Sequence, residues 1–254
     1  MAGFNQVRVA DKIEFNDNAN NQDNIYGNPS TNKIVLVEDF ITPAIDATND
    51  WVVSVGGTGD TIAYNSISGG AALMTSGSVD DDVCSIAGAL VWRGDRNATI
   101  EVRMTPTSAV AGQAWFVGFS DATSEAATNA MPIHYPAGTL TAVADNAAGF
   151  IFDADKSATL IYVAGVKATV LSPTTLGTST GITNAINTAV VLRATLKNDF
   201  VTFHVNGVLK ASRPIAVTQT TLLCPTIHLM TRANASSQTL SVDYIKVWQD
   251  RLSN

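Results

Sequence analysis

Charge is scarce in this chain, and most of it is negative. Only 15% of the 254 residues are Asp, Glu, Lys or Arg, and the formal net charge is -7. A nucleic-acid interface needs a basic face, and binding to an anionic membrane surface needs the same. No apolar run approaches the roughly 20 residues that cross a bilayer. We therefore expect neither nucleic acid nor membrane among the partners.

Cysteine is almost absent too. Cys84 and Cys224 are the only two, which is too few for a disulfide framework. Both lie in apolar, strand-like runs, so we expect buried free thiols. The first residues contain no apolar h-region and no cleavage site, which predicts a protein made in a host cytoplasm without a signal peptide.

Helical periodicity is also nearly absent, and strand patterns take its place. Residues 99–104 alternate between apolar and charged side chains, which is typical of a half-buried strand. Asn206-Gly207 between two β runs is a strong hairpin signal, because both residues tolerate positive φ. About a dozen such strands predict an all-β fold, an antiparallel two-sheet β-sandwich over residues 34–254. Residues 121–146 should form a long loop on one rim. The expected core of the sandwich includes Ile100, Val102, Val117, Phe119, Leu192, Phe203 and Val242.

Residues 1–33 differ from the rest and predict an extended N-terminal arm. Its middle is rich in Asn and Asp, which favour turns over sheet ladders. Such a segment buries too little apolar surface to offset its own ordering entropy. We therefore expect it to contact other subunits through apolar anchors spaced along the chain. These interface residues are Phe4, Val7, Val9, Ile13, Phe15, Ile25 and Tyr26.

Four segments together carry a resemblance to a known superfamily. The strand 190–195, the strand and Asn-Gly hairpin 201–207 and the final strand 242–248 follow one another in the order found in concanavalin A-like lectins and glucanases, the LamG-like jelly rolls. The strand 115–121 is similar to a strand of tailed-phage structural proteins with this fold. The resemblance covers about residues 36–250 and implies a concanavalin-like jelly roll.

The catalytic pattern of that superfamily's glucanases is missing. Those enzymes use a strand that carries Glu-x-Asp-x-x-Glu, with two carboxylates about 5 Å apart. This chain has four glutamates, and none is paired at that spacing. The densest carboxylate cluster is Asp80, Asp81 and Asp82. Three carboxylates on a turn could supply oxygen ligands for Ca²⁺. Asp145-Asn146 and Asp153-x-Asp155 are a further option. Adjacent residues cannot all point at one ion, so we expect no metal and no cofactor. Because the paired glutamates are missing, we also expect no catalytic residues.

These observations favour a non-enzymatic virion protein of a tailed phage. The low charge, the arm and the resemblance point to a capsid decoration, or cement, protein that binds the head shell through its arm and sandwich rim. The expected partners are other virion proteins, the major capsid protein above all, and copies of the chain itself, with a trimer favoured. The alternative is a glycan-binding, lectin-like module of a tail fibre or baseplate, so a glycan ligand stays open. A polysaccharide-degrading enzyme is the third interpretation.

Overall fold

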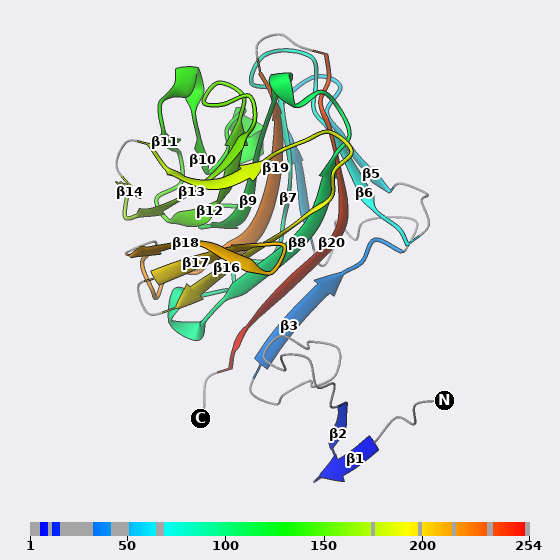
Figure 1. Cartoon of the computed structure of the whole chain (residues 1–254), viewed down its shortest axis with the longest axis vertical. Helices are drawn as coiled ribbons and strands as arrows, with labels where there is room; N and C mark the ends of the chain where they lie inside the picture. The colour runs from blue at the N-terminus through cyan, green and yellow to red at the C-terminus, as the bar shows by residue number, and fades with distance from the viewer. Residues whose placement is uncertain are drawn as a thin grey trace.

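A computed structural model of the chain has two large antiparallel sheets packed face to face (Figure 1). The structure describes residues 6–9, 12–15, 33–41, 51–64, 69–173, 176–197, 200–214, 217–232 and 236–251. No helix in these ranges is long and apolar enough to cross a membrane. The predicted all-β, two-sheet sandwich is confirmed.

Each sheet combines strands from distant parts of the sequence. Sheet I contains, in spatial order, β14 (Val170–Ser172), β13 (Leu160–Lys167), β12 (Ala147–Asp153), β9 (Gln113–Ser120), β19 (Cys224–Thr231), β7 (Val83–Ala87) and β4 (Val52–Val55), and β15 (Thr178–Thr183) also pairs with β13. Sheet II contains β18 (Val208–Pro214), β17 (Phe200–Val205), β16 (Val190–Lys197), β8 (Thr99–Pro106), β20 (Thr239–Asp250), β6 (Ala72–Thr75) and β5 (Thr61–Tyr64), and β3 (Lys33–Glu38) also pairs with β20. Two short 3-10 turns, η1 (Gly94–Arg96) and η2 (Val110–Gly112), precede β8 and β9.

The main core lies between the two sheets, where inward residues of both meet. Phe150 on β12 and Phe203 on β17 form an edge-to-face pair across it, with ring centroids 5.1 Å apart. All seven predicted core residues are at most 1% exposed, as period-two alternation requires. The Asn206-Gly207 hairpin is also confirmed, because both residues have positive φ between β17 and β18.

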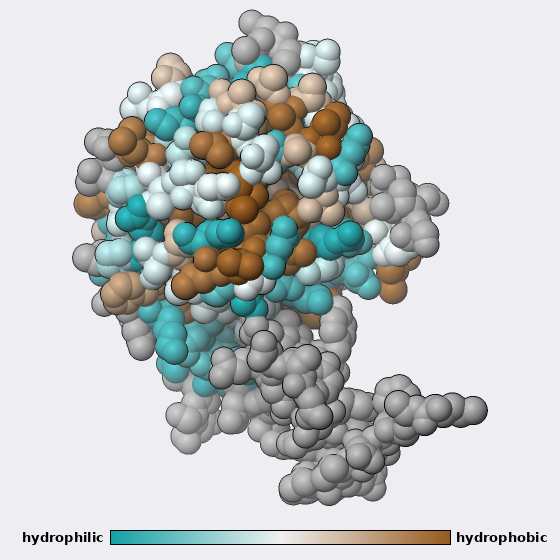
Figure 2. Space-filling view, viewed as in Figure 1, coloured by the Kyte–Doolittle hydropathy of each residue, from teal (hydrophilic) through white to brown (hydrophobic). Residues whose placement is uncertain are grey.

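The two cysteines are buried as expected, and the tryptophans are buried too. Cys84 and Cys224 are buried free thiols. The four tryptophans, Trp51, Trp92, Trp115 and Trp248, are each at most 4% exposed. On the face shown in Figure 2, brown apolar patches lie among teal polar residues.

The long connection 121–146 does not stand at a rim, and that expectation is wrong. It contains η3 (Glu125–Thr128), β10 (Ile133–His134), η4 (Pro136–Gly138) and β11 (Thr141–Ala142). Its apolar side chains, Met131 and Ile133 among them, form a second cluster with Phe116 and Ile151 on the outer face of sheet I. We call this segment the cover. It is apolar enough to exclude water from that face, so β9, β12 and β19 are buried on both sides.

The N-terminal segment contains one described element. β1 (Gln6–Val9) and β2 (Lys12–Phe15) pair as an antiparallel hairpin, so this part of the expected arm turns back on itself. Val7, Val9, Ile13 and Phe15 lie on these strands. Phe4, Ile25 and Tyr26 lie outside the described residues. The predicted contacts of the arm with other subunits stay a prediction.

Candidate functional site

The three consecutive aspartates before β7 point in different directions. Asp81 has a left-handed backbone conformation, and its carboxylate forms an ion pair with Arg232. Asp82 turns inward, where its Oδ2 accepts a hydrogen bond from the Val79 backbone N–H at 3.0 Å. Asp80 is exposed. The structure does not bring these three side chains together.

It does bring Asp81 to the second acidic pair that the sequence contains. Asp153 is the last residue of β12, and Asp155 follows in the turn toward β13. Arg232 comes directly after β19, the neighbour of β9 in sheet I. Its Nε and Nη2 donate to the two oxygens of Asp153 at 3.0 and 2.7 Å. Its Nε also lies 3.9 Å from Asp155 Oδ2. We call Asp81, Asp153, Asp155 and Arg232 the Arg232 cluster.

The members of the Arg232 cluster differ sharply in exposure. The side chains of Arg232 and Asp153 are 3% and 0% exposed, so they form a buried ion pair. Those of Asp81 and Asp155 are 52% and 31% exposed. Two carboxylates that solvent can reach therefore lie beside the buried guanidinium, Asp81 at Nη1 and Asp155 near Nε.

Backbone donors hold the acidic side of the cluster in place. The Tyr135 N–H donates to Asp153 Oδ2 at 2.8 Å. The Ala137 N–H donates to Asp155 Oδ2 at 3.1 Å, and the Asp155 N–H donates to Asp153 Oδ1 at 3.1 Å. Since Tyr135 and Ala137 belong to the cover, the cover fixes these carboxylates as well as the apolar face beneath it.

Burial and charge act in opposite directions in this cluster. Burial raises the pKa of Asp81, and the like charges of Asp80 and Asp155 raise it further, although Arg232 opposes them. Burial alone would lower the pKa of Arg232, but the hydrogen bonds and charge of Asp153 raise it overall. The guanidinium occupies the centre where a cation would sit, and the described residues contain no group of three or more His, Cys, Asp or Glu that could hold a metal.

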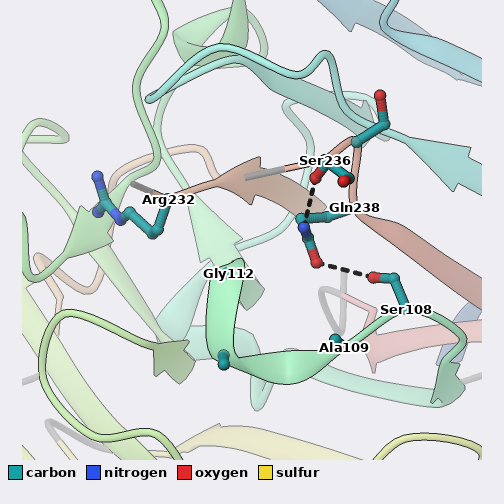
Figure 3. A pocket seen from close by; sticks show the side chains of 8 residues that line it. Ser108, Ala109, Gly112, Arg232, Ser236 and Gln238 are labelled. Carbon is teal, nitrogen blue, oxygen red and sulfur yellow. Dashed lines mark hydrogen bonds between the residues drawn. The ribbon is translucent and has the colours of Figure 1, made fainter. Parts of the chain in front are cut away.

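A cavity of about 390 Å³ lies on the other side of residue 232. Ser108, Gly112, Ser236 and Gln238 line it together with Arg232. The Ser108 hydroxyl donates to Gln238 Oε1 at 2.8 Å, and Gln238 Nε2 donates to the Ser236 carbonyl at 2.5 Å. In Figure 3 the Arg232 guanidinium points away from these groups. Arg232 therefore separates this cavity from the carboxylates of the Arg232 cluster, and the two do not form one pocket.

The histidines of this region are neutral at physiological pH. Burial and the charge of Arg232 lower the pKa of His134 to about 4, and burial lowers that of His228 to about 3. Glu125, which lies in the cover, has its pKa raised by burial. None of these groups contacts the Arg232 cluster through a described hydrogen bond or ion pair.

Reasoning from the sequence missed Arg232, the residue that organises the site. A signal existed, because Arg232 directly follows the apolar strand β19 and is the first charged residue after Arg213. An ionised group at such a place needs a partner of opposite charge. What the sequence did not contain was the long-range pairing that places Asp81 and Asp153 beside it.

Comparison with known proteins identifies the fold. No family model matches the chain, and no curated protein matches it by sequence. Among solved structures, it is similar to a protein of unknown function from Shewanella oneidensis MR-1, with 14% identity, a TM-score of 0.55 and coverage of 89% of this chain and 91% of that one. It is similar to the Bacillus licheniformis beta-glucanase, with 14% identity, a TM-score of 0.56 and coverage of 84% and 97%. It is also similar to the catalytic domain of an endo-1,3-beta-glucanase (laminarinase) from Thermotoga petrophila RKU-1, with 12% identity, a TM-score of 0.55 and coverage of 85% and 97%. The sandwich is thus the concanavalin A-like jelly roll that the sequence resemblance predicted.

These similarities correct two expectations. We expected a non-enzymatic phage virion protein, either a capsid decoration protein or a glycan-binding module of a tail fibre or baseplate. The similar structures include several glucanases and other glycoside hydrolases, so both that role and the exclusion of an enzyme are wrong. The physical reason is that the motifs behind the expectation describe the sandwich, and one sandwich serves many functions. A virion location, a capsid partner and a trimer stay predictions.

Proposed function

We propose that this chain acts on a carbohydrate and hydrolyses a glycosidic bond at the Arg232 cluster. The observation that carries the proposal is the pair of solvent-accessible carboxylates, Asp81 and Asp155, that flank one buried guanidinium. Glycoside hydrolysis needs two carboxyl groups on opposite sides of the scissile bond. The fold supports the same conclusion, since solved glucanases share it.

The two carboxyl groups lie in different surroundings. Asp81 has a raised pKa, so it keeps its proton to higher pH and suits the general acid that protonates the leaving oxygen. Asp155, which accepts a backbone hydrogen bond and faces Arg232, suits the carboxylate that attacks or activates water. Arg232 and Asp153 are positioning residues in this scheme. The cavity beyond residue 232 offers hydroxyl and amide groups for neighbouring sugar units.

The test is release of reducing ends from a panel of β-glucans that includes a β-1,3-glucan. We expect the wild type to hydrolyse at least one of them with an acidic optimum, because Asp81 must be protonated. Asp81→Asn and Asp155→Asn should each lower kcat by about 10²-fold or more, the usual loss on removing an acid or base. Activity that stays unchanged in either variant would exclude that residue from the reaction.

A matched control comes from an aspartate on the other sheet. Asp243 forms an ion pair with Arg103, and its side chain is 28% exposed, which resembles the exposure of Asp155. Asp243→Asn should keep full activity with an unchanged melting temperature. If no β-glucan is hydrolysed, or if the chain binds a glucan and releases no reducing ends, hydrolysis is the wrong proposal.

A further inference from the structure

A second cavity lies on the outer face of sheet II, on the opposite side of the sandwich from the cover. Its volume is about 320 Å³, at the small end of the range of ligand sites. It is lined by Lys33, Asn97, Thr99, Thr195, Lys197 and Asp250, with Trp248. No step of the proposed hydrolysis uses these residues.

Four adjacent elements build this cavity. Thr99 on β8 lies opposite Thr195 on β16 and opposite Trp248 on β20. Lys33 on β3 lies opposite Asp250 at the end of β20. The floor therefore rests on hydrogen-bonded strands, and its side chains keep fixed spacings. Trp248 is only 4% exposed, so it contributes an edge to the cavity and no open stacking face.

The charge of the cavity is opposite to that of the chain. Two lysines and one aspartate line it, whereas the whole chain has a net charge of -7. Asp250 is already engaged, because Lys33 Nζ lies 3.8 Å from its Oδ1 and Asn97 Nδ2 donates to its Oδ2 at 2.5 Å. Among the described residues, no carboxylate forms an ion pair with Lys197. Its ammonium is therefore available to an anion in the cavity.

The neutral groups around Lys197 are hydrogen-bonding groups. The single proton of the Thr99 hydroxyl goes to the Asn97 carbonyl at 3.2 Å, so the Thr195 hydroxyl donates to Thr99 Oγ1 at 3.1 Å. Thr195 keeps a lone pair that accepts from a ligand hydroxyl. Asp250 and Asn97 keep acceptor and donor capacity beyond the bond that joins them. A bare anion would use only the lysines, whereas a ring that carries both hydroxyls and a charge would use both kinds of group.

We propose that this cavity binds one acidic sugar unit, with its anionic group on Lys197 and its hydroxyls on Thr195, Asn97 and Asp250. The anionic group is a carboxylate, as in a uronic acid, or a sulfate ester. The chain would then hold an acidic polysaccharide on the outer face of sheet II, away from the Arg232 cluster. This binding site is independent of the proposed hydrolysis, and either can fail alone.

The experiment is calorimetric titration of the full chain at low ionic strength. The probes are a galacturonic acid oligosaccharide, a sulfated galactan oligosaccharide, a neutral β-1,3-glucan oligosaccharide and inorganic sulfate. We expect one of the two acidic oligosaccharides to bind, and which of them does so identifies the anionic group. Lys197→Gln should weaken that binding about tenfold or more, the contribution of one charge-assisted hydrogen bond.

Two further variants make the result specific. Lys210→Gln removes the same charge from an exposed lysine on the edge strand β18, outside the cavity, and should bind as the wild type does. Thr195→Val should weaken binding of the oligosaccharide more than it weakens binding of inorganic sulfate. The proposal is overturned if neither acidic probe binds, or if Lys197→Gln and Lys210→Gln lower the affinity for the oligosaccharide equally. It is also overturned if inorganic sulfate binds as tightly as the oligosaccharide. Unchanged melting temperatures show that the variants are folded.

Discussion

Replacing Arg232 by methionine should destabilise the protein strongly, because Asp153 would be left without its counter-charge. The side chain of Asp153 is 0% exposed, and removing one partner of a buried ion pair costs about 3–5 kcal/mol. Asp153 keeps two backbone donors, from Tyr135 and Asp155, which favours the lower end of that range. Asp81 and Asp155 reach solvent, so they add little to the loss. In a chain of this size the melting temperature should fall by about 6–20 °C.

A double-mutant cycle separates charge from packing in that result. Arg232→Met with Asp153→Asn leaves no buried charge, so its stability should return to within about 1–2 kcal/mol of the wild type. The single variant should also regain stability as the pH falls. Its unpaired buried carboxyl then has a raised pKa in the folded state, and the fold loses stability as the pH rises through that pKa. Urea unfolding at several pH values measures both effects. A loss below about 1 kcal/mol in Arg232→Met, or a double variant as unstable as the single one, would show that the pair isn't buried as described.

Two further predictions concern the core and the cover. Phe203→Ala should lower the free energy of unfolding in urea by about 3–5 kcal/mol. A double-mutant cycle with Phe150→Ala should show about 0.5–1.5 kcal/mol of coupling from their edge-to-face contact. Strictly additive losses would contradict that contact. Glu125→Gln should raise the melting temperature at neutral pH and leave it unchanged near pH 4. Burial raises the pKa of Glu125 above 4.5 despite the Ser120 hydroxyl, so its contribution to stability is present below 4.5 and is lost as the pH rises through the folded-state pKa. A variant that is less stable than the wild type at pH 7 would refute this reasoning.

The sandwich could be predicted because its information is local. Alternation at residues 99–104 and the Asn206-Gly207 turn each report a strand or hairpin directly. The cover couldn't be predicted in the same way. Its apolar residues, such as Met131 and Ile133, follow no strand or helix period, and only the sheet face beneath them gives them a partner.

The candidate site was predictable only in pieces. Asp81 and the Asp153–Asp155 pair were recognised as acidic groups, but as rival candidates for a metal. They meet because β7 begins at the same edge of sheet I at which β12 and β19 end, and a strand order of that kind is set by contacts between distant residues. The residue types therefore indicated negative charges that need a positive partner. The strand order places Arg232 there in place of a metal ion.

The cover also sets how this molecule can vary. Ser120 and Ala147, the residues at its two ends, lie opposite each other on adjacent strands, so residues 121–146 are topologically the loop of one long hairpin. A loop of that kind can lengthen, shorten or be exchanged without changing the order of any strand. The face beneath limits this freedom, since Phe116 and Ile151 are fully buried there. Any new loop must either cover these side chains or be accompanied by polar replacements for them, so the loop and the sheet face can diverge only together.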